Sequence, residues 1–118
     1  MNRAIDRLSG EFGHDFSEFC VAGVPVDGSF AHQWYIGTNS DQYPDPALLA
    51  RRLDELLQEL NDDYAVERKS ALKDIRLEVI PVQRFYDFMM KNGRLGGQNK
   101  FPRVLKAGQW DSWKEFLS

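Results

Sequence analysis

The sequence predicts an α+β fold, with a small mixed or antiparallel sheet of three to four strands flanked by amphipathic helices. Leucines recur at helical spacing between residues 49 and 60, and apolar residues alternate with charged ones between residues 75 and 79. The two kinds of pattern do not alternate strictly along the chain, which favours α+β over a regular α/β arrangement. With 118 residues, 42% of them hydrophobic, the chain can form one core. We therefore expect residues 1–118 to be a single domain.

The chain opens with a predicted helix and two predicted strands. The helix is indicated by apolar residues at helical spacing that stop near Gly13, namely Ile5, Leu8 and Phe12. Residues 16–24 and 30–36 are rich in aromatic and small apolar side chains, as strands are. Residues 24–29, with Pro25 among them, interrupt this pattern. We expect a hairpin, or a long loop, between two paired strands.

The clearest helix follows a loop that ends at Asp45-Pro46, which is a favourable helix start. Its apolar stripe consists of Leu49, Leu53, Leu56, Leu57 and Leu60, and we expect the stripe to be buried on the sheet. Residues 61–63 are Asn-Asp-Asp, whose side chains compete with the backbone ladder. They predict a bend or a restart, with a second helical piece over residues 64–72.

The last third of the chain contains a strand, two short helices and a basic segment. Ile75, Leu77 and Val79 predict a half-buried strand that Pro81 closes. One short helix is expected around residues 85–89, ending at Asn92-Gly93, and another over residues 111–117. The basic segment lies between these helices.

Charge and composition exclude several classes of protein. The net charge of −3 argues against general nucleic-acid binding. No signal peptide and no long apolar run are visible, and Cys20 is the single cysteine, so the expected location is cytoplasmic, without a membrane partner. Residues 1–90 contain nine Lys and Arg against sixteen Asp and Glu, whereas residues 91–106 contain five basic residues and no acidic one. This local excess of positive charge predicts a place that holds an anion.

Within the basic segment, Gly96-Gly97 allows a close approach of the backbone to a ligand, and Lys100 and Arg103 can neutralise a phosphate. The segment is not a Walker A loop, and the chain has no Gly-x-Gly-x-x-Gly fingerprint. We therefore expect it to complete a site whose other walls lie elsewhere.

Other candidate chemistry is weaker. His14, Cys20 and His32 match no zinc spacing, so no metal site is predicted, and a lone cysteine between Phe19 and Val21 is typical of an unreactive core residue. The Asp62-Asp63 pair can bind a cation, but such pairs more often cap a helix.

Taken together, several motifs closely resemble the C-terminal domain of the auxin-responsive Gretchen Hagen family of acyl-acid amido synthetases. The motifs are Leu53-Asp54-x-x-Leu57-x-x-x-Asn61-x-Asp63-Tyr64, then Arg68 and Phe85, then Gly93-Arg94-Leu95-Gly96-Gly97-Gln98-Asn99-Lys100-x-Pro102-Arg103. Family members are adenylate-forming ligases: they make an acyl-adenylate from ATP and a carboxylic acid, then pass the acyl group to an amino acid. Their small C-terminal domain is a lid that changes orientation between the two half-reactions.

The resemblance implies roles for individual residues. Lys100 matches the lysine of the family's Gln-x-Lys motif, and we expect it to be the catalytic cation at the phosphates. Gln98 and Arg103 are expected to orient the segment or touch phosphate, and Gly96 and Gly97 to let it approach. Arg94 stands where family members often have lysine, which keeps the charge. The expected cofactor of the intact enzyme is ATP with magnesium, with neither bound by this chain alone.

The resemblance covers the lid only, because the family's large N-terminal adenylation domain does not fit in 118 residues. We interpret the chain as an excised domain rather than a free-standing lid-like protein, and expect it to be inactive by itself. Its expected partners are the N-terminal adenylation domain, a carboxylic acid and an amino acid, and the sequence identifies neither substrate.

Two alternatives remain open from the residues. One is a non-catalytic binding module for phosphate-containing ligands or single-stranded nucleic acid, in which Phe101 stacks on bases while Arg94, Lys100 and Arg103 contact phosphates. The acidic remainder of the chain argues against nucleic acid. The other alternative is a purely structural basic segment.

Overall fold

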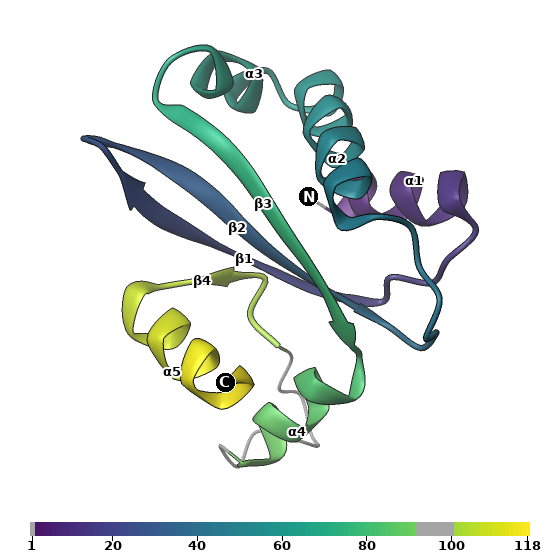
Figure 1. Cartoon of the computed structure of the whole chain (residues 1–118). Helices are drawn as coiled ribbons and strands as arrows, with labels where there is room; N and C mark the ends of the chain where they lie inside the picture. The colour runs from purple at the N-terminus through teal and green to yellow at the C-terminus, as the bar shows by residue number, and fades with distance from the viewer. Residues whose placement is uncertain (1, 92–100) are drawn as a thin grey trace.

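A computed structural model describes residues 2–91 and 101–118 and consists of a four-stranded sheet between two layers of helices (Figure 1). The elements, in chain order, are α1 (Asn2–Phe12), β1 (Glu18–Val26), β2 (Ser29–Thr38), α2 (Pro46–Leu60), α3 (Asp62–Lys69), β3 (Leu72–Pro81), α4 (Gln83–Lys91), β4 (Val104–Leu105) and α5 (Ala107–Leu117). The predicted α+β class is confirmed.

The strand order is β3-β2-β1-β4, and the sheet is mixed. Strands β1 and β2 are antiparallel, whereas β3 runs parallel to β2 and β4 runs parallel to β1. A parallel neighbour requires a crossover connection, and the α2–α3 pair provides it between β2 and β3. The two-residue strand β4 was missed in the sequence, because Val104-Leu105 is too short to show a period.

The hairpin between β1 and β2 is tighter than the sequence predicted. Pro25 does not interrupt the strand, and only Asp27 and Gly28 form the turn, both with positive φ, as two-residue hairpin turns require. The Val21 N–H points away from β2 and donates to the Arg103 carbonyl. Pro25 shares the parity of Val21, so its missing N–H is on the outer edge and costs the β1–β2 ladder nothing.

The predicted helix start and restart are confirmed. The Asp45 carboxylate accepts from the Ala47 N–H at 3.0 Å, and the Asn61 side chain accepts from the Tyr64 N–H at 3.0 Å. Asn61 is therefore the C-cap of α2 and the N-cap of α3.

Three predicted boundaries were wrong. The second helical piece ends at Lys69 and Leu72 begins β3, because its side chain is buried next to the sheet. The first strand begins at Glu18 rather than at residue 16, and α5 begins at Ala107 rather than at residue 111. The predicted end of α4 at Asn92-Gly93 lies outside the described residues.

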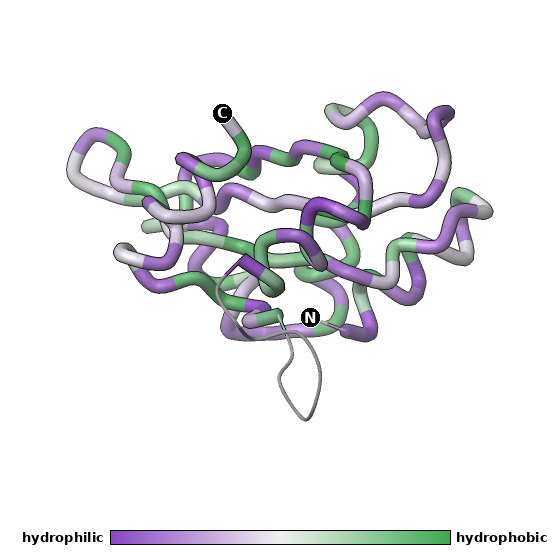
Figure 2. Tube along the Cα trace, turned by 90° about the horizontal axis from the view of Figure 1, so that it is seen from below, coloured by the Kyte–Doolittle hydropathy of each residue, from purple (hydrophilic) through white to green (hydrophobic). Residues whose placement is uncertain are grey.

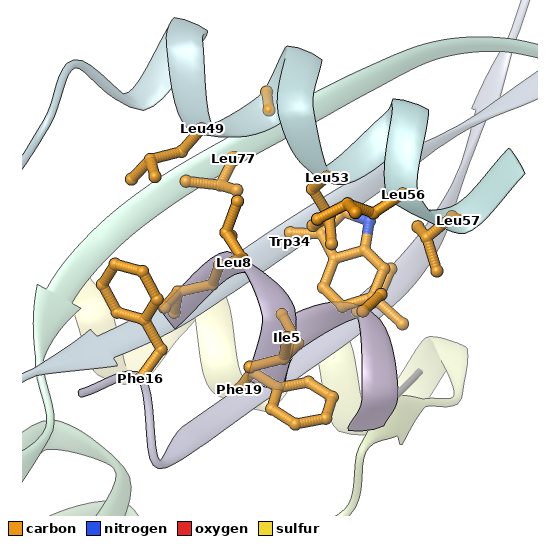
Figure 3. Close-up of a cluster of buried hydrophobic side chains, with 14 of the residues drawn as sticks. Ile5, Leu8, Phe16, Phe19, Trp34, Leu49, Leu53, Leu56, Leu57 and Leu77 are labelled. Carbon is orange, nitrogen blue, oxygen red and sulfur yellow. The ribbon is translucent and has the colours of Figure 1, made fainter. Parts of the chain in front are cut away.

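Alternating side chains of the sheet belong to two separate cores. The α1–α2 cluster joins the leucines of α2 with α1 and with Phe19, Trp34 and Leu77 of the sheet (Figure 3). The α4–α5 cluster joins Cys20, Ala22 and Tyr35 on the opposite face with Phe85, Met89, Phe101, Leu105 and Trp113. Figure 2 shows hydrophobic and hydrophilic residues alternating along the trace, as expected where each helix has one buried face.

Candidate functional site

The basic segment predicted to hold an anion is described only at its ends. Gly96, Gly97, Gln98 and Lys100 lie outside the described residues, as does Arg94. The described part contains Lys91, at the end of α4, and the stretch 101–106, which leads through β4 toward α5.

Phe101 is 3% exposed and is surrounded by aromatic rings. Its ring centroid lies 4.8 Å from that of Phe85, 4.9 Å from that of Trp113 and 5.8 Å from that of Phe88. The contacts with Phe85 and Trp113 are edge-to-face, a favourable arrangement for aromatic pairs. The ring is therefore a core residue and is not available to stack on a base, which argues against the nucleic-acid alternative.

Two residues further on, the backbone joins the edge of the sheet. The Arg103 carbonyl accepts from the Val21 N–H at 2.9 Å, and Val104 and Leu105 pair with Val21 and Ala22. The chain that follows the basic segment is thus fixed both by aromatic packing and by a backbone ladder.

The Arg103 side chain turns back onto the start of β1. Its Nη1 donates to the Glu18 carboxylate at 2.9 Å and to the Phe19 carbonyl at 3.1 Å, and the guanidinium carbon lies 4.4 Å from the centre of the Phe19 ring. The side chains of Arg103 and Glu18 are 32% and 17% exposed, so the pair is partly shielded from water. We call this arrangement of Glu18, Phe19 and Arg103 the Arg103 clasp. Sequence reasoning missed Glu18, which is 85 residues away along the chain.

A groove of about 380 Å³ lies beside the clasp, between α1 and the start of β1. Arg103 lines it together with the carboxylates of Asp6 and Asp15. The charges in this groove are mixed, so it is not a simple anion cradle.

The other end of the basic segment is fixed by the ring of Phe116 in α5. The guanidinium carbon of Arg84 lies 4.8 Å from the centre of this ring, and the Lys91 ammonium lies 5.6 Å from it. Arg84 also donates to the Phe116 carbonyl at 3.1 Å. Both described ends of the segment therefore contact the same helix, since Phe101 packs on Trp113 of α5.

The histidines and the cysteine are not brought together. Cys20 is fully buried in the α4–α5 cluster, and burial raises the pKa of its thiol. His32 lies on the opposite face of the sheet, between the rings of Phe30 and Tyr64, and His14 stacks on Phe16. Within residues 2–91 and 101–118, no group of three or more His, Cys, Asp and Glu side chains is arranged to hold a metal ion. Asp62 and Asp63 lie in the first turn of α3, where acidic side chains interact favourably with the helix dipole.

A second polar cluster ties α2 to α3 and β3. The Asp54 carboxylate accepts from the Tyr64 hydroxyl at 2.7 Å and from Nε of Arg68 at 3.1 Å, while Nη1 of Arg68 donates to the Leu72 carbonyl at 3.0 Å. Three residues of the motif that carried the family resemblance thus form one connected network. Its described partners are structural, because they join three elements of the fold.

The fold and the site define a small α+β domain in which residues 103–105, at the end of a basic segment, pair with the edge of the sheet. The model of the family described as GH3 family C-terminal domain matches residues 1–116. The chain therefore belongs to this family, which confirms the resemblance drawn from the motifs.

The fold also occurs in solved structures. The chain aligns with AtGH3.15 acyl acid amido synthetase in complex with 2,4-DB at a TM-score of 0.72 and 14% identity, over 97% of this chain and 22% of that one. A second structure, of GH3.15 acyl acid amido synthetase, gives a TM-score of 0.71 and 15% identity, over 97% and 23%. This chain thus spans less than a quarter of the length of either protein. No curated protein sequence matches it, and none of the described helices is long and apolar enough to cross a bilayer.

Proposed function

We propose that this chain acts as the C-terminal lid domain of an ATP-dependent acyl-acid amido synthetase. The observation that carries the proposal is the GH3 C-terminal family match over residues 1–116. The solved relatives with this fold are acyl acid amido synthetases, and each is more than four times as long as this chain. The partner that this proposal requires is the N-terminal adenylation domain of the same enzyme, which we propose lies in the cytoplasm.

The proposed reaction has two steps. A carboxylate oxygen attacks the α-phosphate of ATP and expels pyrophosphate, giving an acyl-adenylate. The amine of an amino acid then attacks the acyl carbon, forming an amide and releasing AMP. The lid serves the first step by bringing Lys100 to the phosphates, with Gln98 and Arg103 orienting the segment and Gly96 and Gly97 allowing the approach.

Charge explains why a lysine helps. The attacking carboxylate and the phosphate are both anions, and negative charge builds up on the phosphoryl oxygens in the transition state. A cation placed there stabilises the transition state more than the ground state, and one such group is commonly worth ~10²-fold or more in rate. ATP and magnesium are proposed to bind mainly to the rest of the enzyme, with this domain contributing the basic segment.

The test is acid-dependent pyrophosphate exchange in the enzyme that contains this domain. Lys100→Ala should lower the exchange rate at least tenfold, with little change in folding. Lys73→Ala is the matched control, because Lys73 is an exposed lysine on β3. Unchanged exchange in Lys100→Ala would remove Lys100 from the mechanism. The isolated 118-residue chain should catalyse no exchange by itself.

A further inference from the structure

We infer that Glu18 is a positioning residue for residues 101–106, the stretch that follows Lys100, and that Arg103 acts by holding this stretch in place rather than by touching phosphate. The inference rests on the proposed function and deepens it. It adds a residue, Glu18, that lies outside every motif of the family resemblance.

The guanidinium of Arg103 is already engaged within the domain. Nη1 is engaged by two acceptors, the Glu18 carboxylate at 2.9 Å and the Phe19 carbonyl at 3.1 Å. One face of the guanidinium lies on the Phe19 ring at 4.4 Å. A phosphate that recruited Arg103 would have to compete with a carboxylate already paired with it, and removal of Arg103 would leave that carboxylate, 17% exposed, without its cation. The arrangement therefore favours a fixed side chain.

The Arg103 clasp joins the stretch that follows Lys100 to strand β1. Glu18 and Phe19 are the first two residues of β1, and the Arg103 carbonyl accepts from Val21 on the same strand. The side chain and the backbone carbonyl of Arg103 thus both form hydrogen bonds with β1. Phe101, two residues earlier, is buried against Trp113 and Phe85. Since residue 101 follows Lys100 directly in the chain, any displacement of this stretch also displaces the backbone to which Lys100 is joined.

Positioning can be separated from stability by comparison with an ion pair elsewhere in the domain. Another ion pair joins distant parts of the chain: Nε of Arg52 in α2 donates to the Glu11 carboxylate of α1 at 2.6 Å, and Nη2 donates to it at 2.8 Å. Its side chains are 28% and 34% exposed, and it lies on the α1–α2 side of the sheet. If ion pairs only add stability, the loss of either pair should have the same effect on activity.

The first experiment uses the 118-residue chain. Glu18→Gln and Glu11→Gln are compared by amide hydrogen exchange and by urea denaturation. We expect Glu18→Gln to speed exchange of the Val21 N–H at least tenfold more than Glu11→Gln does, once exchange is corrected for global stability. Equal exchange in the two variants would overturn the inference.

The second experiment uses the enzyme that contains this domain, in the pyrophosphate exchange assay. Glu18→Gln should lower kcat about five- to tenfold with KM for ATP nearly unchanged, whereas Glu11→Gln should leave both unchanged. Arg103→Lys, which keeps the charge but loses the planar fork, should resemble Glu18→Gln. Exchanging the two residues, Glu18→Arg with Arg103→Glu, should recover part of kcat.

These results can be distinguished from a failure of the proposed function. If Lys100→Ala is inactive in exchange while Glu18→Gln is fully active, the lid function stands and the positioning role of Glu18 is wrong. A raised KM for ATP in Arg103→Lys, with normal activity in Glu18→Gln, would show that Arg103 binds phosphate directly and would also overturn the inference. If Lys100→Ala is fully active, the proposed role of Lys100 fails, and the amide exchange at Val21 still decides whether the clasp holds this edge.

Discussion

The two faces of the sheet are covered in different ways. On one face, α1 and α2 pack long aliphatic side chains around Trp34, and most of the leucines come from a single helix (Figure 3). On the other face, α4 and α5 contribute aromatic rings: Phe85, Phe88, Trp113 and Phe116. Phe101 and Leu105 of β4, which lie outside the helices, also pack on this second face.

The two clusters also differ in how they contact the described ends of the basic segment. The α1–α2 cluster is built mainly from regular helices, and it contacts the described part of the basic segment through Phe19, whose ring lies against the Arg103 guanidinium. The α4–α5 cluster encloses one described end of the segment and contacts the other through Phe116. Damage to the first cluster away from Phe19 should therefore lower stability alone, whereas damage to the second should lower both stability and the activity of the proposed lid.

The largest effect is expected from Trp113→Ala. Trp113 is fully buried and contacts five other rings, so its truncation should cost ~3–5 kcal/mol of unfolding free energy, measured by urea denaturation. Leu53→Ala, at the centre of the other cluster, should cost ~2–5 kcal/mol. At a temperature where both variants stay folded, only Trp113→Ala should lower pyrophosphate exchange. Equal activity would contradict the division between the two faces.

Tyr64→Phe removes the hydroxyl that donates to Asp54 at 2.7 Å. A hydrogen bond to a charged group is worth ~1.5–3 kcal/mol, so the variant should be destabilised by about that amount without loss of exchange activity. Burial, followed by Asp54, raises the pKa of Tyr64. The wild type should therefore lose stability as pH rises above ~10, the ordinary tyrosine value, because ionisation is favoured only in the unfolded chain. Tyr64→Phe should lose less stability over this range, and an identical loss would contradict the role of Tyr64.

Two glycine-to-alanine substitutions each add a single methyl group, one on the aromatic face of the sheet and one on α1. A Cβ at Gly37 would lie 3.0 Å from the Phe85 ring and 3.0 Å from the backbone of Val82, so Gly37→Ala should cost ~1–3 kcal/mol through overpacking on the aromatic face. A Cβ at Gly10, within α1, meets nothing within 4 Å. Gly10→Ala should stabilise the chain by ~0.5–1 kcal/mol through helix propensity. Thermal unfolding of both variants checks the two signs, and a stabilised Gly37→Ala would show that α4 can move away from the sheet.

The smallest effect is expected from His32, on the α1–α2 side. Burial lowers its pKa, while Glu67 and Asp54 favour the charged form and Arg68 opposes it. Its Nδ1 is buried and has no hydrogen-bond partner among the described residues. Its contribution to stability is thus present above ~6.5, the ordinary histidine value, and is lost as pH falls below it, because only the unfolded chain takes up the proton there. Urea midpoints between pH 8 and pH 5 should fall more for the wild type than for His32→Gln. Parallel curves would show that the pKa of His32 is the same in the folded and the unfolded chain.

The elements that could be predicted from the sequence are those with a local cause. Asp45-Pro46 and Asn61 act on N–H groups two or three residues away, and the leucine period of α2 lies within fifteen residues. Leu72 and Val104-Leu105 were misjudged for the opposite reason. Their strand state depends on pairing with Phe30, Val21 and Ala22, which are distant in the chain.

The candidate site divides in the same way. The glycines and cations of residues 94–103 are visible in the sequence because charge and backbone freedom are properties of single residues. That Phe101 is a core residue, and that Arg103 pairs with Glu18, follows only from the folding of α5 and β1 against this stretch. The i, i+3 spacings Phe85/Phe88 and Trp113/Phe116 were the available signal for an aromatic layer.

The sequence by itself determined the α+β class, the capped α2–α3 pair, the basic segment and, through its motifs, the family. The tertiary structure decided that the sheet has two separate cores and that Glu18 holds Arg103. The reason is range: helix periods, caps and net charge depend on neighbours within a few residues. The pairing of β4 with β1 and the burial of Phe101 depend on contacts about 80 residues apart or between separate helices, which exist only once the chain has folded.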